Sequence, residues 1–151
     1  MHISKINSYD KVLDKEKLRE FTRGIGLAAH GIGIGSFVYL RRIIEFFIEE
    51  AHQVAIKDQS WKDEPAYLNL KVGQRIESLK SFLPPILVEA RKVYSILSKG
   101  IHELTEKECL DYFQPLKVII ELILDDREIE RKRREKEKEA KDAIAKISGK
   151  I

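Results

Sequence analysis

The chain has 151 residues, of which 43% are hydrophobic, and a formal net charge of +3 at pH 7. This content suits one domain with a hydrophobic core and argues against a disordered chain, while so small a net charge does not by itself indicate nucleic-acid binding. The single cysteine, Cys109, excludes an internal disulfide and a zinc site built from several cysteines, and it favours a reducing, cytoplasmic location.

Residues 1–13 alternate polar and apolar side chains without a clear period, so we expect an N-terminal arm or linker there. The first helix is expected to run from Asp14, whose side chain suits an N-cap, to about His30. Gly24 and Gly26 weaken this helix, and they indicate close packing against a neighbouring helix.

The stretch that follows joins a glycine-rich turn to an almost wholly apolar helix. The apolar residues recur at helical spacing: Phe37, Leu40, Ile44, Phe47, Ile48, Ala51 and Ala55. Ser36 is the expected N-cap, and the helix is expected to end near Asp58. Because the apolar surface is wider than one stripe, we expect this helix at the centre of the fold. Charged residues within it argue against a membrane span.

Three further helices are expected after the polar loop 58–65. The first covers Leu70–Leu83, and the second begins at Pro85 and ends with Gly100 as a C-cap. The third begins at the Thr105/Glu108 capping box. Its expected inward-facing residues are Cys109, Tyr112, Phe113, Leu116, Ile119, Ile120 and Ile123, and Pro115 is expected to bend it or to lie in solvent.

The character of the chain changes after residue 126, where charges of alternating sign leave almost no apolar face. Glutamate and basic residues four apart, such as Glu130 with Arg134 and Glu137 with Lys141, favour a helix. The sequence therefore predicts an all-α fold, a compact bundle of about five helices over residues 14–126, with residues 127–151 as a projecting charged helix.

The glycine-rich turn and the arginine pair are the candidate phosphate-binding residues. Free N–H groups around Gly33, Gly35 and Ser36 at a helix start favour an anion. The turn follows a helix instead of a strand and lacks the Lys-Ser/Thr of a P-loop, which favours a simple packing turn. Arg41 and Arg42 need acidic or phosphate partners in an apolar helix, and these are either a ligand or glutamates of the same chain.

A second candidate site lies at the junction of the last two helices, where His102 follows Lys99 by three residues. A histidine there either acts as a general acid or base, or bonds to the backbone of the junction. His30 follows Arg23 by seven residues and can share a face with it. His30 and His52 show no metal-ligand spacing, and the sequence predicts neither a metal site nor a cofactor.

Two blocks, Gly33–Glu45 and Tyr94–Glu103, resemble an uncharacterised bacterial family of HEPN-like helical domains, and the likeness extends over about residues 13–126. The resemblance implies a helical bundle, often dimeric, in a superfamily associated with RNA cleavage, nucleotide binding and defence against phage or other stress. It also implies an upstream domain or partner protein. Active nucleases of that superfamily carry an arginine about one turn before a histidine. Here that turn before His102 offers only Lys99, which favours a non-catalytic member.

The leading hypothesis is a non-catalytic HEPN-like module that self-associates and binds RNA or a nucleotide phosphate through Arg41, Arg42 and the Gly31–Ser36 turn. The alternatives are an endoribonuclease that uses His102 and Lys99, and a purely structural oligomerisation domain. A homodimer is expected to form through the first or the central helix, because a small bundle leaves part of an apolar central helix uncovered.

Overall fold

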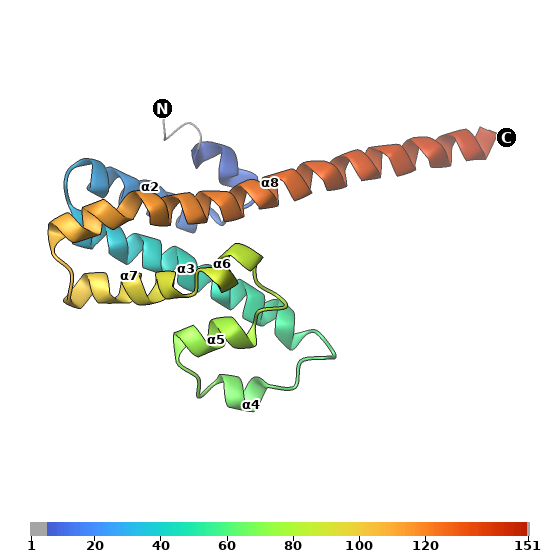
Figure 1. The fold of residues 1–151 in the computed structure, drawn as a ribbon. Helices are drawn as coiled ribbons and strands as arrows, with labels where there is room; N and C mark the ends of the chain where they lie inside the picture. Colours follow the sequence, from blue (N-terminus) through green and yellow to red (C-terminus); the bar gives the residue numbers. More distant parts are fainter. Residues whose placement is uncertain (1–5, 151) are drawn as a thin grey trace.

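The computed structural model describes residues 6–150, and within that range every regular element is a helix (Figure 1). In chain order they are the 3-10 helix η1 (Ser8–Lys11), α2 (Lys15–Ala29), α3 (Gly33–Ile56), α4 (Glu64–Tyr67), α5 (Val72–Ser78), α6 (Pro85–Glu89), α7 (Lys92–His102) and α8 (Glu106–Lys150). The predicted all-α bundle with a projecting C-terminal helix is confirmed. No helix in this range combines the length and apolar character of a membrane span.

Helix α3 lies at the centre, where it packs against α2, α7 and α8. Its buried side chains include all seven of the predicted apolar residues: Phe37, Leu40, Ile44, Phe47, Ile48, Ala51 and Ala55. Helices of the same chain cover α3 on several sides, so its wide apolar surface belongs to the core. The reason for expecting a dimer interface on α3 is therefore removed.

The start of α2 follows the prediction. The Asp14 carboxylate accepts hydrogen bonds from the backbone N–H groups of Glu16 and Lys17, at 3.0 and 3.3 Å. Gly24 allows α3 to approach, because a Cβ there would lie 3.1 Å from Cβ of Tyr39. Gly26 has open space around it, so close packing explains only one of these two glycines.

The start of α3 differs from the prediction, because the helix begins at Gly33 and Ile32 occupies the N-cap position. Ser36 is therefore inside the first turn, where its hydroxyl donates to the Gly33 carbonyl at 2.6 Å. Gly31, with φ of +79°, makes the left-handed turn between α2 and α3. A Cβ on Gly33 would lie 2.8 Å from Cβ of Cys109, so this glycine is needed for contact with α8.

The middle of the chain forms four short helices where two were expected. The segment 85–102 breaks near Ala90, because α6 packs on α8 while α7 packs on α3. The turn between them lets Leu87 and Val93 face different neighbours, and both are buried. The expected helix over 70–83 is regular only in α5, although Leu83 is still buried.

Gly100 is not a C-cap. It lies inside α7, which continues to His102, and a Cβ at this position would overlap the Phe37 ring of α3. The absence of a side chain therefore serves helix contact and not helix termination.

Residues 6–13, part of the expected arm, pack on the bundle. Ile6, Tyr9 and Leu13 are buried, and the Tyr9 hydroxyl donates to Asp125 Oδ1 at 2.6 Å. This contact joins η1 to α8 across more than a hundred residues. Residues 1–5 of the predicted arm lie outside the described range.

The Thr105/Glu108 capping box that begins α8 is confirmed, with both reciprocal hydrogen bonds at 3.1 Å. The buried side chains of α8 include most of those predicted: Cys109, Phe113, Leu116, Ile120 and Ile123. Tyr112 is 44% exposed, contrary to the prediction, and Ile119 is only half-buried. Pro115 lies inside the helix on its exposed face, where water can reach the carbonyl left without a donor.

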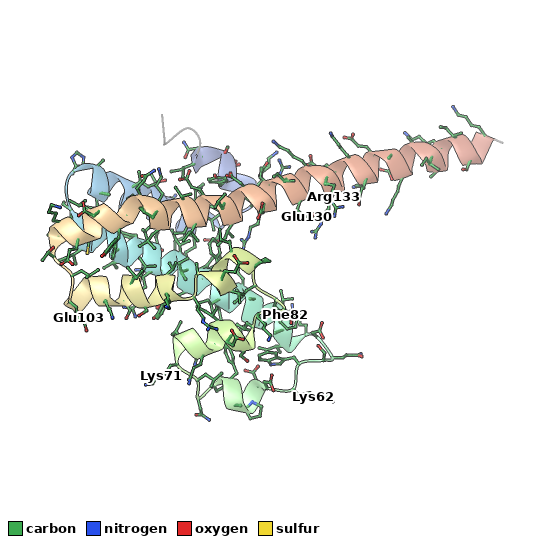
Figure 2. All side chains as sticks on the ribbon, in the orientation of Figure 1. Lys62, Lys71, Phe82, Glu103, Glu130 and Arg133 are labelled. Atoms are coloured by element: carbon green, nitrogen blue, oxygen red, sulfur yellow. The ribbon has the colours of Figure 1, made fainter. Side chains whose placement is uncertain are left out.

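Beyond the bundle, α8 continues as a single helix whose residues 132–150 are all exposed (Figure 1). Figure 2 shows Glu130 and Arg133 on this projecting part. The predicted pair between Glu130 and Arg134 is present at 3.1 Å. Glu137 lies 3.7 Å from Arg133, one turn earlier, and not beside the predicted Lys141.

Candidate functional site

The glycine-rich turn holds an anion, but that anion belongs to the protein. The backbone N–H groups of Gly33 and Ile34 both donate to Oε2 of Glu106, the first residue of α8. A carboxylate at this point satisfies two of the free donors of the α3 N-terminus and opposes the positive end of its dipole. The packing interpretation of the turn accounts for these contacts, and an external phosphate would have to displace Glu106.

Arg41 is paired within its own helix. Its Nε donates to Glu45 Oε1 at 3.0 Å, and its guanidinium lies 5.7 Å from the centre of the Tyr94 ring on α7. The Tyr94 hydroxyl donates to the same Glu45 oxygen at 2.9 Å. Burial and the bond to Glu45 raise the pKa of the Tyr94 phenol. This cluster joins α3 to α7, as the structural interpretation of the arginine pair expects.

Arg42 points to the opposite neighbour, α2. Its Nη2 lies 2.7 Å from Oε1 of Glu20, whose side chain is only 8% exposed and also pairs with Lys17 at 3.3 Å. The expected partners were glutamates later in the chain, and Glu20 was not among them. The Arg42 side chain remains half exposed, so one of the two arginines can still meet a ligand.

Lys99 and His102 lie in the last turn of α7, and both side chains are exposed. Within residues 6–150, neither side chain forms a hydrogen bond or an ion pair, and no arginine contacts the imidazole. Lys99 lines a hollow of about 630 Å³ between α5 and α7, together with Arg91 and Lys71. His102 does not line it. The structure thus places the two candidate catalytic residues near each other without assembling an acid–base pair.

His52 takes part in a cluster that the sequence did not reveal. Its Nε2 lies 2.8 Å from Glu64 Oε1, and its ring stacks on Tyr67 with centroids 4.1 Å apart. Trp61 donates from its indole nitrogen to Glu64 at 3.1 Å and meets the Tyr67 ring edge-on. These contacts fasten the loop after α3 and the helix α4 to the body of the protein. The role of His52 is therefore structural.

The remaining reactive groups do not form a site. Cys109 is buried, its Sγ donates to the Gly100 carbonyl at 3.5 Å, and burial raises the pKa of the thiol. Among the described residues, no three histidine, cysteine or acidic side chains converge as metal ligands.

A row of cations on α2 is the feature that sequence reasoning missed. Lys15, Arg19 and Arg23 follow one another at four-residue spacing on one exposed face of the helix, which we call the α2 cationic face. They line a hollow of about 440 Å³ with Thr22 and Leu18, and Asn7 completes it from the preceding segment. No carboxylate lines this hollow.

The three cations of this face are unpaired, since none forms an ion pair with any acidic residue between positions 6 and 150. His30, the C-cap of α2, extends the face toward the glycine-rich turn, as its seven-residue spacing from Arg23 predicts. The signal was available in the sequence as the spacing 15, 19 and 23. It could be interpreted only once the structure had shown which of the other basic residues pair with carboxylates.

No protein-family model, curated protein or solved structure matches this chain.

Proposed function

We propose that the chain is a non-catalytic HEPN-like helical module that binds the phosphates of single-stranded RNA along the α2 cationic face. The observation that carries the proposal is the hollow lined by Lys15, Arg19 and Arg23 and by no carboxylate. Exposed cations that no internal acid neutralises attract a polyanion and release its counterions on binding.

The spacing of the three cations suits an extended strand. Residues four apart on a helix are separated by about 6 Å along its axis, which is similar to the distance between consecutive phosphates of a single strand. Arg19 also offers a planar group that can bind a phosphate with two hydrogen bonds. The half-exposed Arg42 and His30 lie at the two flanks of α2 and can extend this contact.

The charged part of α8 is the obvious competitor, because residues 127–151 contain ten basic and six acidic residues, a net charge of +4. Its arginines are already paired, for example Arg131 with Glu128 and Arg133 with Glu130. A nucleic acid that approaches this helix meets carboxylates on every side, whereas the hollow on α2 contains none. The α2 cationic face is therefore the better surface for phosphates.

Catalysis is not part of the proposal. A nuclease needs a group that transfers a proton, and that group must be held by a partner in the correct orientation. Within the described range His102 has no such partner, and the nearby cation, Lys99, faces a separate hollow. The module is expected to bind RNA and leave it intact.

The test compares two variants that lose the same charge. In the first, Lys15, Arg19 and Arg23 are replaced by Gln, and in the second, Lys132, Lys136 and Lys138 of α8 are replaced by Gln. Fluorescence anisotropy with a labelled single-stranded RNA of mixed sequence measures the affinity at low salt. Three exposed contacts of roughly 0.5 kcal/mol each predict about a tenfold loss for the α2 variant.

The α8 variant is expected to bind nearly as well as the wild type. Equal losses in the two variants would show that only net charge matters, and no binding by the wild type would remove the proposal. Circular dichroism of each variant confirms that the helices are intact. RNA recovered after the incubation is analysed on a gel, where cleavage that disappears in a His102→Ala variant would contradict the non-catalytic assignment.

A further inference from the structure

Five large apolar side chains lie exposed along the outer face of α8. Val118, Leu122, Ile129, Ile144 and Ile147 are between 41% and 65% exposed. At 100° per residue, their positions fall within an arc of about 80° around the helix axis. They form a single strip, which we call the α8 outer strip, along the bundle and onto the projecting end. A row of exposed apolar side chains of this length indicates a contact surface.

The charges within the same strip have opposite signs at its two ends. Asp111 and Asp125 lie in the half of α8 that packs on the bundle, and Lys136 and Lys150 lie in the projecting half. The helical angles of these four residues fall within or beside the arc of the strip. A strip that is acidic at one end and basic at the other is complementary to a copy of itself that runs in the opposite direction.

We propose that the α8 outer strip binds the α8 outer strip of a second copy, antiparallel, about a two-fold axis near residue 131. In this register, facing residues have numbers that add to 261 or 262. It pairs Asp111 with Lys150, Val118 with Ile144, Leu122 with Ala140 and Asp125 with Lys136, and each pair occurs twice by symmetry. Acidic residues thus face basic ones, and apolar residues face apolar ones.

A parallel arrangement does not have this complementarity. It would place Asp125 against Asp125 and Lys136 against Lys136, and like charges at facing positions oppose association. One oxygen of Asp125 accepts the Tyr9 hydroxyl, which fixes the carboxylate at the edge of the strip. The charge pattern therefore selects both the partner, a second copy of this chain, and its direction.

The antiparallel arrangement also gives the projecting end of α8 a surface to contact. Figure 1 shows α8 running along one side of the bundle and continuing past it. In the dimer, Ile144 and Ile147 of one copy lie on Val118 and its neighbours in the bundle of the other. The contact from Asp111 to Lys150 is about 60 Å long, and one helix is about 10 Å wide. An area on the order of 600 Å² per copy predicts a weak, concentration-dependent dimer.

This inference does not depend on RNA binding, because the α2 cationic face and the α8 outer strip share no residue. It also differs from a dimer through the first or the central helix, because α3 is covered by its own chain. The charged end of α8 becomes part of the interface instead of remaining outside it.

Sedimentation equilibrium from micromolar to near-millimolar protein tests the interface. Ile147→Glu places a charge in the α8 outer strip, and Ala145→Glu places the same charge on the opposite face of the same exposed helix. The wild type and Ala145→Glu are expected to form dimers, and Ile147→Glu is expected to remain monomeric. A monomeric wild type at every concentration, or equal weakening by both substitutions, would overturn the proposal.

Cysteine cross-linking tests the direction. Val118→Cys and Ile144→Cys proteins are oxidised separately and as an equal mixture, with the wild type as the control for buried Cys109. The antiparallel register predicts a disulfide-linked species chiefly in the mixture, where positions 118 and 144 meet. Efficient cross-linking of Ile144→Cys alone would instead indicate a parallel pair and would contradict the proposed register.

Discussion

Glu106 caps α3 from another helix, and its removal gives a direct measure of that contact. The substitution Glu106→Ala leaves the backbone N–H groups of Gly33 and Ile34 without their carboxylate acceptor. The loss of an N-cap acceptor costs about 0.5–2 kcal/mol, and a charged acceptor with two donors belongs in the upper half of that range. We expect a loss of about 1–2 kcal/mol, since water can replace part of the contact.

Thermal unfolding followed by circular dichroism measures this loss. For a chain of this size, each kcal/mol lowers Tm by about 2–4 °C. Glu106→Gln keeps an acceptor without the charge, so it is expected to lose less stability than Glu106→Ala. Glu103→Ala is the matched control, because this exposed glutamate forms no hydrogen bond or ion pair within residues 6–150.

The vacated amides also allow a chemical rescue. Inorganic phosphate can bind two free N–H groups at a helix start, so it is expected to restore part of the stability of Glu106→Ala. The general stabilising effect of phosphate on all proteins is measured with the wild type and Glu103→Ala at the same ionic strength. If Glu106→Ala is as stable as Glu103→Ala, the carboxylate does not cap α3 and the reasoning fails.

Two further predictions concern stability. Gly100→Ala is expected to lose about 1–3 kcal/mol in denaturant unfolding, because its methyl group would overlap an aromatic ring of α3, whereas Gly26→Ala, with open space around it, should gain about 0.5–1 kcal/mol; the same sign of change at both glycines would contradict the packing described here. Burial raises the pKa of the Tyr9 phenol, and the hydrogen bond to Asp125 raises it further. A pKa that is higher in the folded state contributes stability that is present below about pH 10 and is lost as the pH rises further. Tyr9→Phe should therefore be less stable than the wild type at neutral pH but lose less stability between neutral and strongly alkaline pH, and parallel curves for the two proteins would refute this assignment.

The features that the sequence predicted well are those decided by nearby residues. The N-cap at Asp14 and the capping box of Thr105 and Glu108 involve contacts within three positions. The periodic apolar stripe of α3 reports burial directly, since a stripe wider than one face requires neighbours on several sides. The projecting helix follows from the change in composition after residue 126.

The features that the sequence did not predict depend on residues far apart in the chain. Glu106 reaches the start of α3 across about seventy positions, so Ser36 is not needed as a cap. The break between α6 and α7 has no glycine or proline at its centre, and it arises because the two helices face different neighbours. Gly100 resembles a C-cap in sequence, yet the Phe37 ring explains it.

The candidate site shows the same division. Sequence reasoning singled out Arg41 and Arg42 because adjacent arginines in an apolar helix need partners, and the structure supplies Glu45 and Glu20. Identifying cations that lack partners requires knowledge of every ion pair, which no local pattern provides. The α2 cationic face could therefore be recognised only from the folded chain.

The dependence of RNA affinity on salt tests the proposed function most directly. For single-stranded nucleic acid, the logarithm of affinity falls with the logarithm of salt concentration by about 0.7 for each phosphate contacted. If Lys15, Arg19 and Arg23 each contact one phosphate, replacing all three by Gln should reduce the slope by about 2. The matched replacement of three lysines on α8 should leave the slope nearly unchanged. An unchanged slope in the α2 variant, or an equal reduction in both variants, would contradict the assignment of RNA binding to the α2 cationic face.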